Sequence, residues 1–137
     1  MNDLSINSEL VRRILSGFIR SETNRAGYSK IVVGVSGGLD SSLACYLAAE
    51  ALGGENVLAV RMPYKTSSQE SLDHAQLIIE ATGVQSMTIP ITEMADGLIN
   101  QFPDMSTVRM GNIMARCRMI VLYDQSVAFG GLVLGTG

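Results

Sequence analysis

The sequence predicts an α/β fold, a parallel sheet with helices on both faces. Short continuous apolar runs, which are typical of strands buried on both faces, alternate along the chain with longer segments of helical periodicity. This alternation favours parallel pairing, because a crossover helix carries the chain back to the same end of the sheet. In such sheets, ligands bind beyond the carboxyl ends of the strands.

Each expected element has a local signal. The helices are expected at residues 8–25, 41–52, 67–82, 92–101 and 107–128, and the strands at 31–35, 57–62, 85–89 and 132–134. Gly27, Gly53 and Gly83 follow helical segments, where glycine commonly ends a helix. Ser67 and Glu70 have the spacing of a capping box that opens the third helix.

Size and composition restrict the class of protein. The 137 residues predict a single domain covering positions 1–137, and 47% hydrophobic residues predict a substantial core. A net charge of −3 without a Lys or Arg run argues against a nucleic-acid partner. No signal peptide or membrane-spanning run is present, and the two cysteines lack metal-ligand spacing. We therefore expect a cytoplasmic protein that binds no membrane.

A turn rich in glycine and serine joins the first expected strand to the next helix. Its glycines allow close approach of the backbone to a ligand, and the helix start offers free N–H groups, so it suits phosphate. A carboxylate beside phosphates requires a cation, which predicts Mg²⁺ at Asp40. The alternative is an ordinary turn in which Asp40 caps the helix. The residues of this loop are Gly34, Val35, Ser36, Gly37, Gly38, Leu39, Asp40 and Ser41.

The segment Ser-Gly-Gly-Leu-Asp-Ser at 36–41 resembles the signature of the N-type ATP pyrophosphatases. The resemblance implies an adenine nucleotide alpha hydrolase-like, Rossmann-like fold. Members of this superfamily cleave ATP between the α and β phosphates and adenylate a substrate oxygen. A nitrogen or sulfur nucleophile then displaces AMP.

Three further segments resemble the ammonia-dependent NAD synthetases in order and spacing. They are Arg-Met-Pro-Tyr-Lys-Thr-Ser-Ser at 61–68, Gly-Asn-Ile-Met-Ala-Arg-Cys-Arg-Met-Ile at 111–120 and Leu-Gly-Thr-Gly at 134–137. The resemblance implies ATP-dependent amidation of deamido-NAD (nicotinic acid adenine dinucleotide) with ammonia. The implied products are NAD, AMP and pyrophosphate, formed through an NAD-adenylate.

The resemblance also implies roles for individual residues. Residues 34–41 would wrap the ATP phosphates with Mg²⁺ on Asp40, Arg61 and Met62 would border the adenine, and Thr136 would contact ATP. Arg116, with Asn112 on the same helix face, would bind deamido-NAD. No side chain is assigned as catalytic, because the loop and the metal would stabilise the transition state. From the residues alone, Arg116 reads as a solvated arginine.

The helix expected at 107–128 has two apolar faces. The broader one is predicted to lie in the core and comprises Met110, Ile113, Met114, Cys117, Ile120 and Val121. The second comprises Val108, Ala115, Met119 and Leu122. A helix that is apolar on two faces usually has two partners, so we predict a homodimer through this helix, in agreement with the dimer that the resemblance implies. The alternative is a second packing surface within the chain.

Two other functions compete with NAD synthesis. One is a different adenylating enzyme of the superfamily, such as one that modifies tRNA, and the other is a nucleotide-binding module without catalysis. NAD synthetases continue well beyond the fourth strand, with a metal-binding glutamate and further lysines, whereas this sequence ends at Gly137. We therefore expect an incomplete domain that binds ATP weakly and has little or no turnover. Ammonia would come from solution or from a separate protein.

Overall fold

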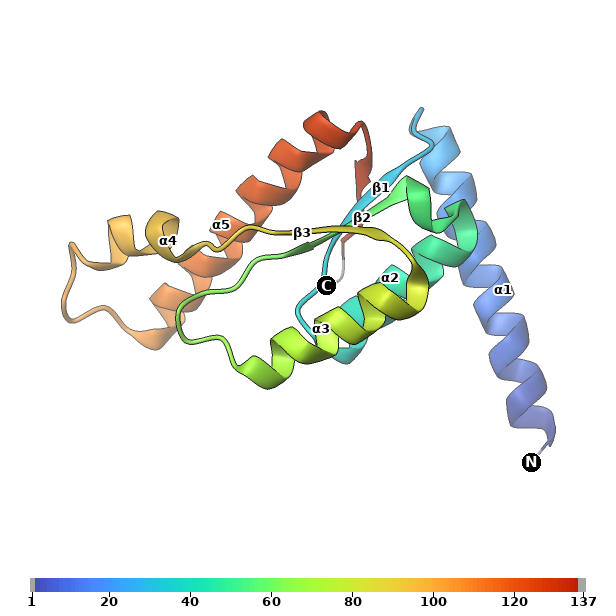
Figure 1. The fold of residues 1–137 in the computed structure, drawn as a ribbon, viewed down its shortest axis with the longest axis horizontal. Helices are drawn as coiled ribbons and strands as arrows, with labels where there is room; N and C mark the ends of the chain where they lie inside the picture. The colour runs from blue at the N-terminus through green and yellow to red at the C-terminus, as the bar shows by residue number, and fades with distance from the viewer. Residues whose placement is uncertain (1, 136–137) are drawn as a thin grey trace.

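A computed structural model describes the backbone of residues 2–135 and the side chains of residues 8–135. The helices are α1 (Asn2–Arg25), α2 (Leu39–Leu52), α3 (Gln69–Thr82), α4 (Thr92–Ile99) and α5 (Thr107–Phe129), with a short 3₁₀ turn at Gly54–Asn56 (Figure 1). The strands are β1 (Ile31–Gly34), β2 (Val57–Arg61), β3 (Gln85–Thr88) and β4 (Leu132–Val133). This succession confirms the predicted alternation of strands and helices.

The strands form one parallel sheet in the order β3-β2-β1-β4. Ile31 of β1 pairs with Val57 of β2 on one side and with Leu132 of β4 on the other. The chain thus moves outward from β1 to β3 and then returns past β1 to β4. The direction of winding reverses between β1 and β4, which is where ligands bind in open α/β sheets.

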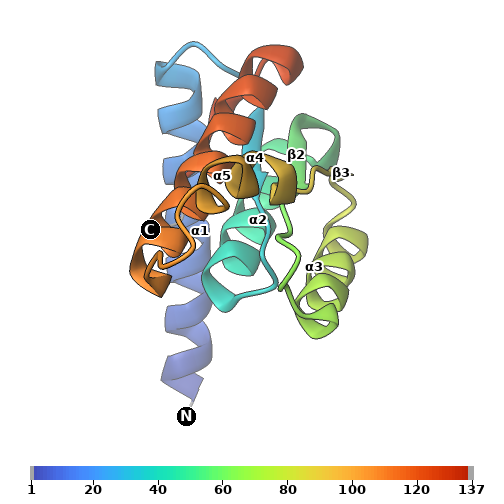
Figure 2. The ribbon, with the colours of Figure 1, turned by 90° about the vertical axis from the view of Figure 1, so that its left-hand side faces the viewer.

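Helices cover both faces of the sheet, as predicted. Val33 and Ala59 point to the face that packs against α2 and α3, while Val32 and Val60 point to the face that packs against α4 and α5. The two views show the sheet between these helix pairs, with α1 on the outer side of α2 (Figures 1 and 2). Within residues 2–135, no helix has the length and apolar character that crossing a membrane requires.

Helix α1 packs on α2 through polar contacts and Ile19, and leaves most of its apolar stripe outside. Ser16 is buried and its Oγ lies 3.3 Å from Glu50 Oε2, while Arg20 Nε donates to the carbonyl oxygen of Ala51 at 2.9 Å. The apolar stripe of α1 is more than half exposed at Leu10, Val11, Ile14 and Phe18. The apolar periodicity therefore predicted the helix, but these side chains do not contribute to the core.

The start of α3 differs from the prediction by one residue. The N-cap is Ser68, whose Oγ accepts a hydrogen bond from the backbone N–H of Ser71 at 3.1 Å. Ser67 belongs to the preceding turn, where its Oγ accepts from the N–H of Tyr64 at 3.0 Å. The capping box predicted at Ser67 and Glu70 is wrong, because the turn after β2 already uses the Ser67 hydroxyl.

The buried side of α5 also differs from the prediction. Cys117 and Val121 are buried as expected, but Ile120 is 61% exposed and its assignment to the core is wrong. In the second strip, Leu122 is buried, whereas Val108 is 73% exposed. The helix turns the side that carries Leu122 toward the sheet, because it packs across β1 and β4, and this turns Ile120 outward.

Candidate functional site

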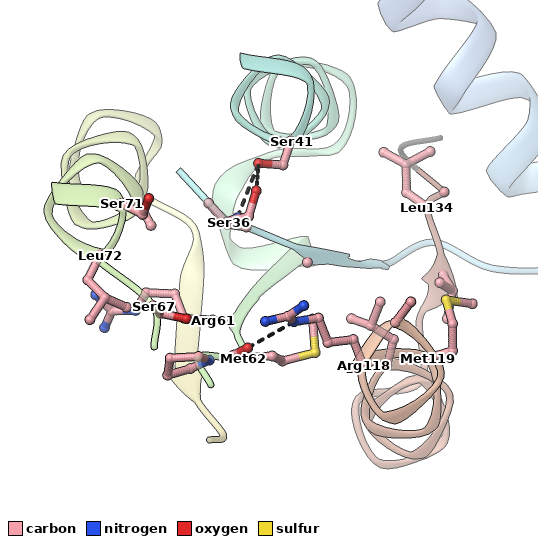
Figure 3. A pocket seen from close by; sticks show the side chains of 18 residues that line it. Ser36, Ser41, Arg61, Met62, Ser67, Ser71, Leu72, Arg118, Met119 and Leu134 are labelled. Atoms are coloured by element: carbon pink, nitrogen blue, oxygen red, sulfur yellow. Dashed lines mark hydrogen bonds between the residues drawn. The ribbon is translucent and has the colours of Figure 1, made fainter. Parts of the chain in front are cut away.

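A cavity of about 490 Å³ lies beyond the carboxyl ends of β1, β2 and β4 (Figure 3). Its walls are the segments that follow these strands, the side of α3 that faces them and the sheet-facing side of α5. Most of the lining is apolar. The residues that line it are Gly34, Val35, Ser36, Ser41, Arg61, Met62, Pro63, Ser67, Ser71, Leu72, Ala75, Ala115, Arg118, Met119, Leu122, Val133, Leu134 and Gly135.

The predicted phosphate loop forms one end of this cavity and is held by its own hydroxyl groups. Ser41 is buried, and its Oγ accepts from the backbone N–H of Ser36 at 3.2 Å. The Ser36 and Ser41 hydroxyl oxygens lie 3.1 Å apart, and Ser41 Oγ is 3.3 Å from the carbonyl oxygen of Gly38 (Figure 3). These contacts hold the loop in a defined shape, which reduces the ordering cost of binding a ligand.

One glycine of the loop, Gly37, is required by the protein's own packing, and another, Gly34, lies against the end of a flexible side chain. Gly37 has φ +88°, and a Cβ there would lie 2.3 Å from the carbonyl oxygen of Ser71. A Cβ on Gly34 would lie 2.9 Å from Met62 Cε. In contrast, Gly38 has φ −78°, and a Cβ there would find no atom closer than Ser36 Oγ at 3.5 Å. Only Gly38 leaves open space at the start of α2.

Asp40 stands in the first turn of α2 and does not cap it. The N-cap is Gly38, which provides no side-chain cap, so the alternative of Asp40 as a helix cap does not hold. Its side chain is exposed, and among the residues that the structure describes it has no hydrogen bond or ion pair. A free carboxylate at a helix start beside an anion-binding loop is available to a cation.

Arg61 and Met62 lie at the carboxyl end of β2, where the sequence placed them. Met62 is buried, and Arg61 Nη1 donates to Gln76 Oε1 of α3 at 2.6 Å. Arg61 Nε is buried and finds no acceptor within residues 8–135. Both residues line the cavity.

Sequence reasoning missed Arg118. Its side chain extends from α5 into the cavity, where Nε donates to the carbonyl oxygen of Met62 at 3.0 Å (Figure 3). Burial lowers the pKa of the Arg118 guanidinium. Its position between Ala115 and Leu122, within the second apolar strip, was a signal that this arginine faces an interior space.

The residues predicted to bind the second substrate lie elsewhere. Asn112 and Arg116 are exposed on α5 and do not line the cavity. The sequence correctly separates Arg116 from Arg118, since the two side chains point to different sides of the helix. Thr136 lies outside the described residues.

The cavity combines the predicted phosphate loop, two arginines and an apolar interior, which suits a nucleotide with a phosphate tail. A family model described as NAD synthase matches residues 11–137 of the sequence. The chain belongs to the NAD synthase family. The resemblance first seen in the four motifs is thus confirmed over nearly the whole chain.

Curated relatives named NH3-dependent NAD+ synthetase match the chain with high identity. The one from Trichlorobacter lovleyi is 56% identical over 136 residues, covering 99% of this chain and 50% of the relative. The one from Fusobacterium nucleatum is 47% identical over 136 residues, covering 99% of this chain and 53% of the relative. The chain therefore spans about half the length of the curated NAD synthetases that it matches.

Solved structures of the family show the same fold. An NH3-dependent NAD synthetase from Campylobacter jejuni has a TM-score of 0.87 and 32% identity, covering 94% of this chain and 56% of its own. A glutamine-dependent NAD+ synthetase from Acinetobacter baumannii, solved in complex with ADP, has a TM-score of 0.84 and 33% identity. The match covers 90% of this chain and 24% of that one. An NMN synthetase from Francisella tularensis has a TM-score of 0.85 and 25% identity. The match covers 94% of this chain and 54% of that one.

Proposed function

We propose that this chain forms the ATP-binding half of an ammonia-dependent NAD synthetase, which amidates deamido-NAD and releases NAD, AMP and pyrophosphate. The observation that carries the proposal is the serine- and glycine-rich loop at the strand ends, which opens into a cavity lined by arginines. Membership of the NAD synthase family over residues 11–137 connects this cavity to one reaction.

In this proposal the cavity holds ATP. The backbone N–H groups of residues 36–41 and the serine hydroxyls bind the phosphates at the start of α2, and Arg61 and Met62 border the adenine. The deamido-NAD carboxylate attacks the α-phosphorus, pyrophosphate leaves, and ammonia then displaces AMP from the adenylate. Because charge develops on the departing pyrophosphate, fixed N–H donors stabilise the transition state without a side-chain nucleophile.

Asp40 is the proposed ligand of Mg²⁺. It is an exposed carboxylate without a protein partner in the described part of the chain, beside the phosphate loop. Mg²⁺ is commonly held by one or two carboxylates together with substrate phosphates, so a single aspartate here fits the ion. When bound, the ion would neutralise charge on the phosphates. Residues 8–135 contain no group of three or more acidic, His or Cys side chains that could hold a metal alone.

The second substrate is assigned to the outer side of α5. Arg116 and Asn112 are exposed there, and an arginine without an ion-pair partner among the described side chains is free to bind an anionic substrate. Thr136, at the end of the chain, is proposed to contact ATP on the strength of the family match.

We also propose a homodimer through α5, with a contact surface that differs from the strip expected from sequence. Met119 and Ala115 line the cavity, whereas Ile120, Tyr123 and Val127 form an exposed face at helical spacing. The apolar stripe of α1 is exposed as well. Burying such faces against a second copy removes apolar surface from water. A contact through this face of α5 would also place Arg116 between the two copies.

The proposed location is the cytoplasm. Both cysteines, Cys45 and Cys117, are free and buried, which is the usual state of cysteines in a reducing compartment.

The reaction can be tested with the chain alone and fused to the second half of the Trichlorobacter lovleyi relative. Each protein is incubated with ATP, Mg²⁺, deamido-NAD and ammonium, and NAD and pyrophosphate are measured. We expect the fusion to form NAD and pyrophosphate in equal amounts, and the chain alone to bind ATP with little turnover. A fusion carrying Asp40→Asn is the inactive control. A folded fusion that binds ATP but forms no NAD would contradict the proposal.

The same assay separates the other candidates. The similarity to an NMN synthetase makes nicotinic acid mononucleotide the competing acceptor, and preferential formation of NMN would assign that function instead. Pyrophosphate release that requires tRNA would indicate a tRNA-modifying enzyme. ATP binding without pyrophosphate release from any of these substrates, even in the fusion, would indicate a nucleotide-binding module.

A further inference from the structure

The cavity carries positive charge without acidic residues to balance it. Arg61 and Arg118 both line it, and no aspartate or glutamate is among the described lining residues. Arg61 Nη1 is hydrogen-bonded to the neutral amide of Gln76, and Arg118 Nε to the neutral carbonyl of Met62. Neither arginine takes part in an ion pair within residues 8–135. The positive charge of both side chains is therefore available to an anion that enters the cavity.

The contact with Met62 fixes the orientation of the Arg118 side chain. With Nε bound to the carbonyl oxygen, the two terminal nitrogens of the guanidinium point away from α5 toward the middle of the cavity (Figure 3). Only one of the five N–H groups of the guanidinium is needed for this contact. A neutral donor would satisfy the carbonyl equally well, so the carbonyl does not explain why the residue is charged.

Partial burial makes this charge less favourable than in open water unless an anion is present. Placing a charged group in apolar surroundings is unfavourable without a partner of opposite charge. Burial lowers the pKa of the Arg118 guanidinium. An arginine fork matches the geometry of phosphate oxygens, to which it can donate two parallel hydrogen bonds.

The phosphate loop lacks a cation of its own. Residues 34–42 contain no lysine or arginine, so the loop can offer phosphates only N–H groups, hydroxyl groups and the metal proposed at Asp40. Arg118 reaches the cavity from α5, on the opposite face of the sheet from α2.

We propose that Arg118 binds a phosphate of the nucleotide in this cavity and supplies the fixed positive charge that the loop lacks. The inference rests on the proposed function, in which the cavity holds ATP. It assigns to Arg118 a role distinct from that of Arg116, which lies on another side of the same helix. The phosphate bound is one that AMP shares with ATP, namely the α-phosphate, because the guanidinium lies on the side of the cavity next to Met62 and the proposed adenine site.

The test compares nucleotides with and without phosphate by titration calorimetry. ATP, AMP and adenosine are titrated into the unaltered chain and into Arg118→Gln, Arg118→Lys and Arg109→Gln. Arg109→Gln is a matched control, because it removes the same charge from the first turn of α5, where Arg109 stacks on Phe102 outside the cavity. Arg118→Lys keeps the charge but loses the fork.

We expect Arg118→Gln to weaken ATP and AMP binding about tenfold or more, the usual effect of losing a charge-assisted hydrogen bond, and to change adenosine binding little. Arg118→Lys should retain part of the affinity, and Arg109→Gln nearly all of it. The salt dependence of ATP binding should also fall in Arg118→Gln, because a charge contact has been lost.

Other outcomes would overturn the inference. Equal weakening of adenosine and AMP would show that Arg118 only supports the Met62 carbonyl. Unchanged ATP affinity in Arg118→Gln, with the unaltered chain binding ATP, would reject the inference and leave the proposed function intact. If the unaltered chain and the fusion bind neither ATP nor adenosine, both fail together. If Arg118→Gln does not fold, as seen by circular dichroism, Arg118→Lys decides: a partial loss of ATP and AMP affinity with adenosine binding unchanged would support the inference, and an unchanged AMP affinity would overturn it.

Discussion

Gly37 lies directly against the carbonyl group of Ser71, so that a Cβ added to Gly37 would come within 2.3 Å of that oxygen. This contact joins the phosphate loop to the first turn of α3. The positive φ of +88° at Gly37 would strain any other residue independently of the contact. The conformation of the loop therefore depends on α3 as well as on β1 and α2.

We expect Gly37→Ala to destabilise the protein by about 2 kcal/mol or more, because it combines backbone strain with a clash against main-chain atoms. The free energy of unfolding, measured by urea titration, checks this. Gly38→Ala is the matched control, since Gly38 has negative φ and open space around it. It should cost less, about 0.5–1 kcal/mol, because alanine is a poorer N-cap than glycine.

The same pair separates packing from binding. If the open space at Gly38 is where phosphate approaches the backbone, Gly38→Ala should stay folded and bind ATP more weakly. Equal stability of the two variants would contradict the assignment of Gly37 as a packing position. Unchanged ATP affinity in Gly38→Ala would argue against phosphate at this turn.

Asp40→Asn should remove the Mg²⁺ dependence of ATP binding while leaving the fold intact. The side chain is exposed and without a protein partner in the described residues, so the stability cost is limited to the loss of charge at a helix start, about 0.3–1 kcal/mol. Titration of ATP with and without Mg²⁺ measures the effect.

Glu70→Gln is the control for this prediction. Glu70 also lies in the first turn of a helix, α3, but does not belong to the predicted phosphate loop. It should lower stability to a similar extent and leave the Mg²⁺ dependence unchanged. An Asp40→Asn variant that keeps both its affinity and its dependence on Mg²⁺ would exclude Asp40 as a metal ligand.

A carboxylate outside the cavity ties the turn after β2 to α4. The hydroxyl of Tyr64 donates to one oxygen of Asp96, and Lys65 Nζ donates to the other at 2.9 Å. These hydrogen bonds, first from Tyr64 and then from Lys65, lower the pKa of Asp96. A carboxyl group whose pKa is lower in the folded state stabilises the fold above its unfolded pKa of about 3.9 and loses this contribution as the pH falls through the folded value.

Asp96→Asn should therefore lower the melting temperature at neutral pH, with a difference from the unaltered chain that shrinks below about pH 4. Thermal unfolding across a pH series measures this. Asp104→Asn, an exposed aspartate in the turn before α5 with no side-chain hydrogen bond in the structure, should show no such trend. If the difference in melting temperature between Asp96→Asn and the unaltered chain stays constant from pH 7 to below about pH 4, the charge of Asp96 is not what stabilises the turn.

Ile120→Glu should dissociate the proposed dimer. Ile120 is 61% exposed on the outer face of α5, and a carboxylate buried in an apolar contact is strongly unfavourable. Sedimentation equilibrium measures the assembly. Leu77→Glu on α3, where Leu77 is 62% exposed, is the matched control and should not change the molecular mass. If the unaltered chain sediments as a monomer at high concentration, the dimer proposal is wrong.

Local patterns predicted most of the fold, because they reflect local physics. Strands buried on both faces read as continuous apolar runs, and glycines with positive φ, such as Gly53 and Gly83, commonly end helices. The phosphate loop was recognisable for the same reason, since its turn and its helix start are formed by consecutive residues. The cap at Ser68 was missed because Ser67 and Ser68 are alike in sequence, and only the turn at Tyr64 distinguishes them.

The sequence by itself determined the order and type of the elements, the loop at residues 36–41 and membership of the NAD synthase family. The tertiary structure decided the strand order β3-β2-β1-β4, the outward position of Ile120 and the entry of Arg118 into the cavity. The positions of Ile120 and Arg118 depend on the rotation of α5 about its axis. That rotation is set by the packing of α5 across β1 and β4, two strands that are far apart along the chain. The helical period of α5 alone allows more than one side of the helix to face the sheet, so the sequence did not decide it.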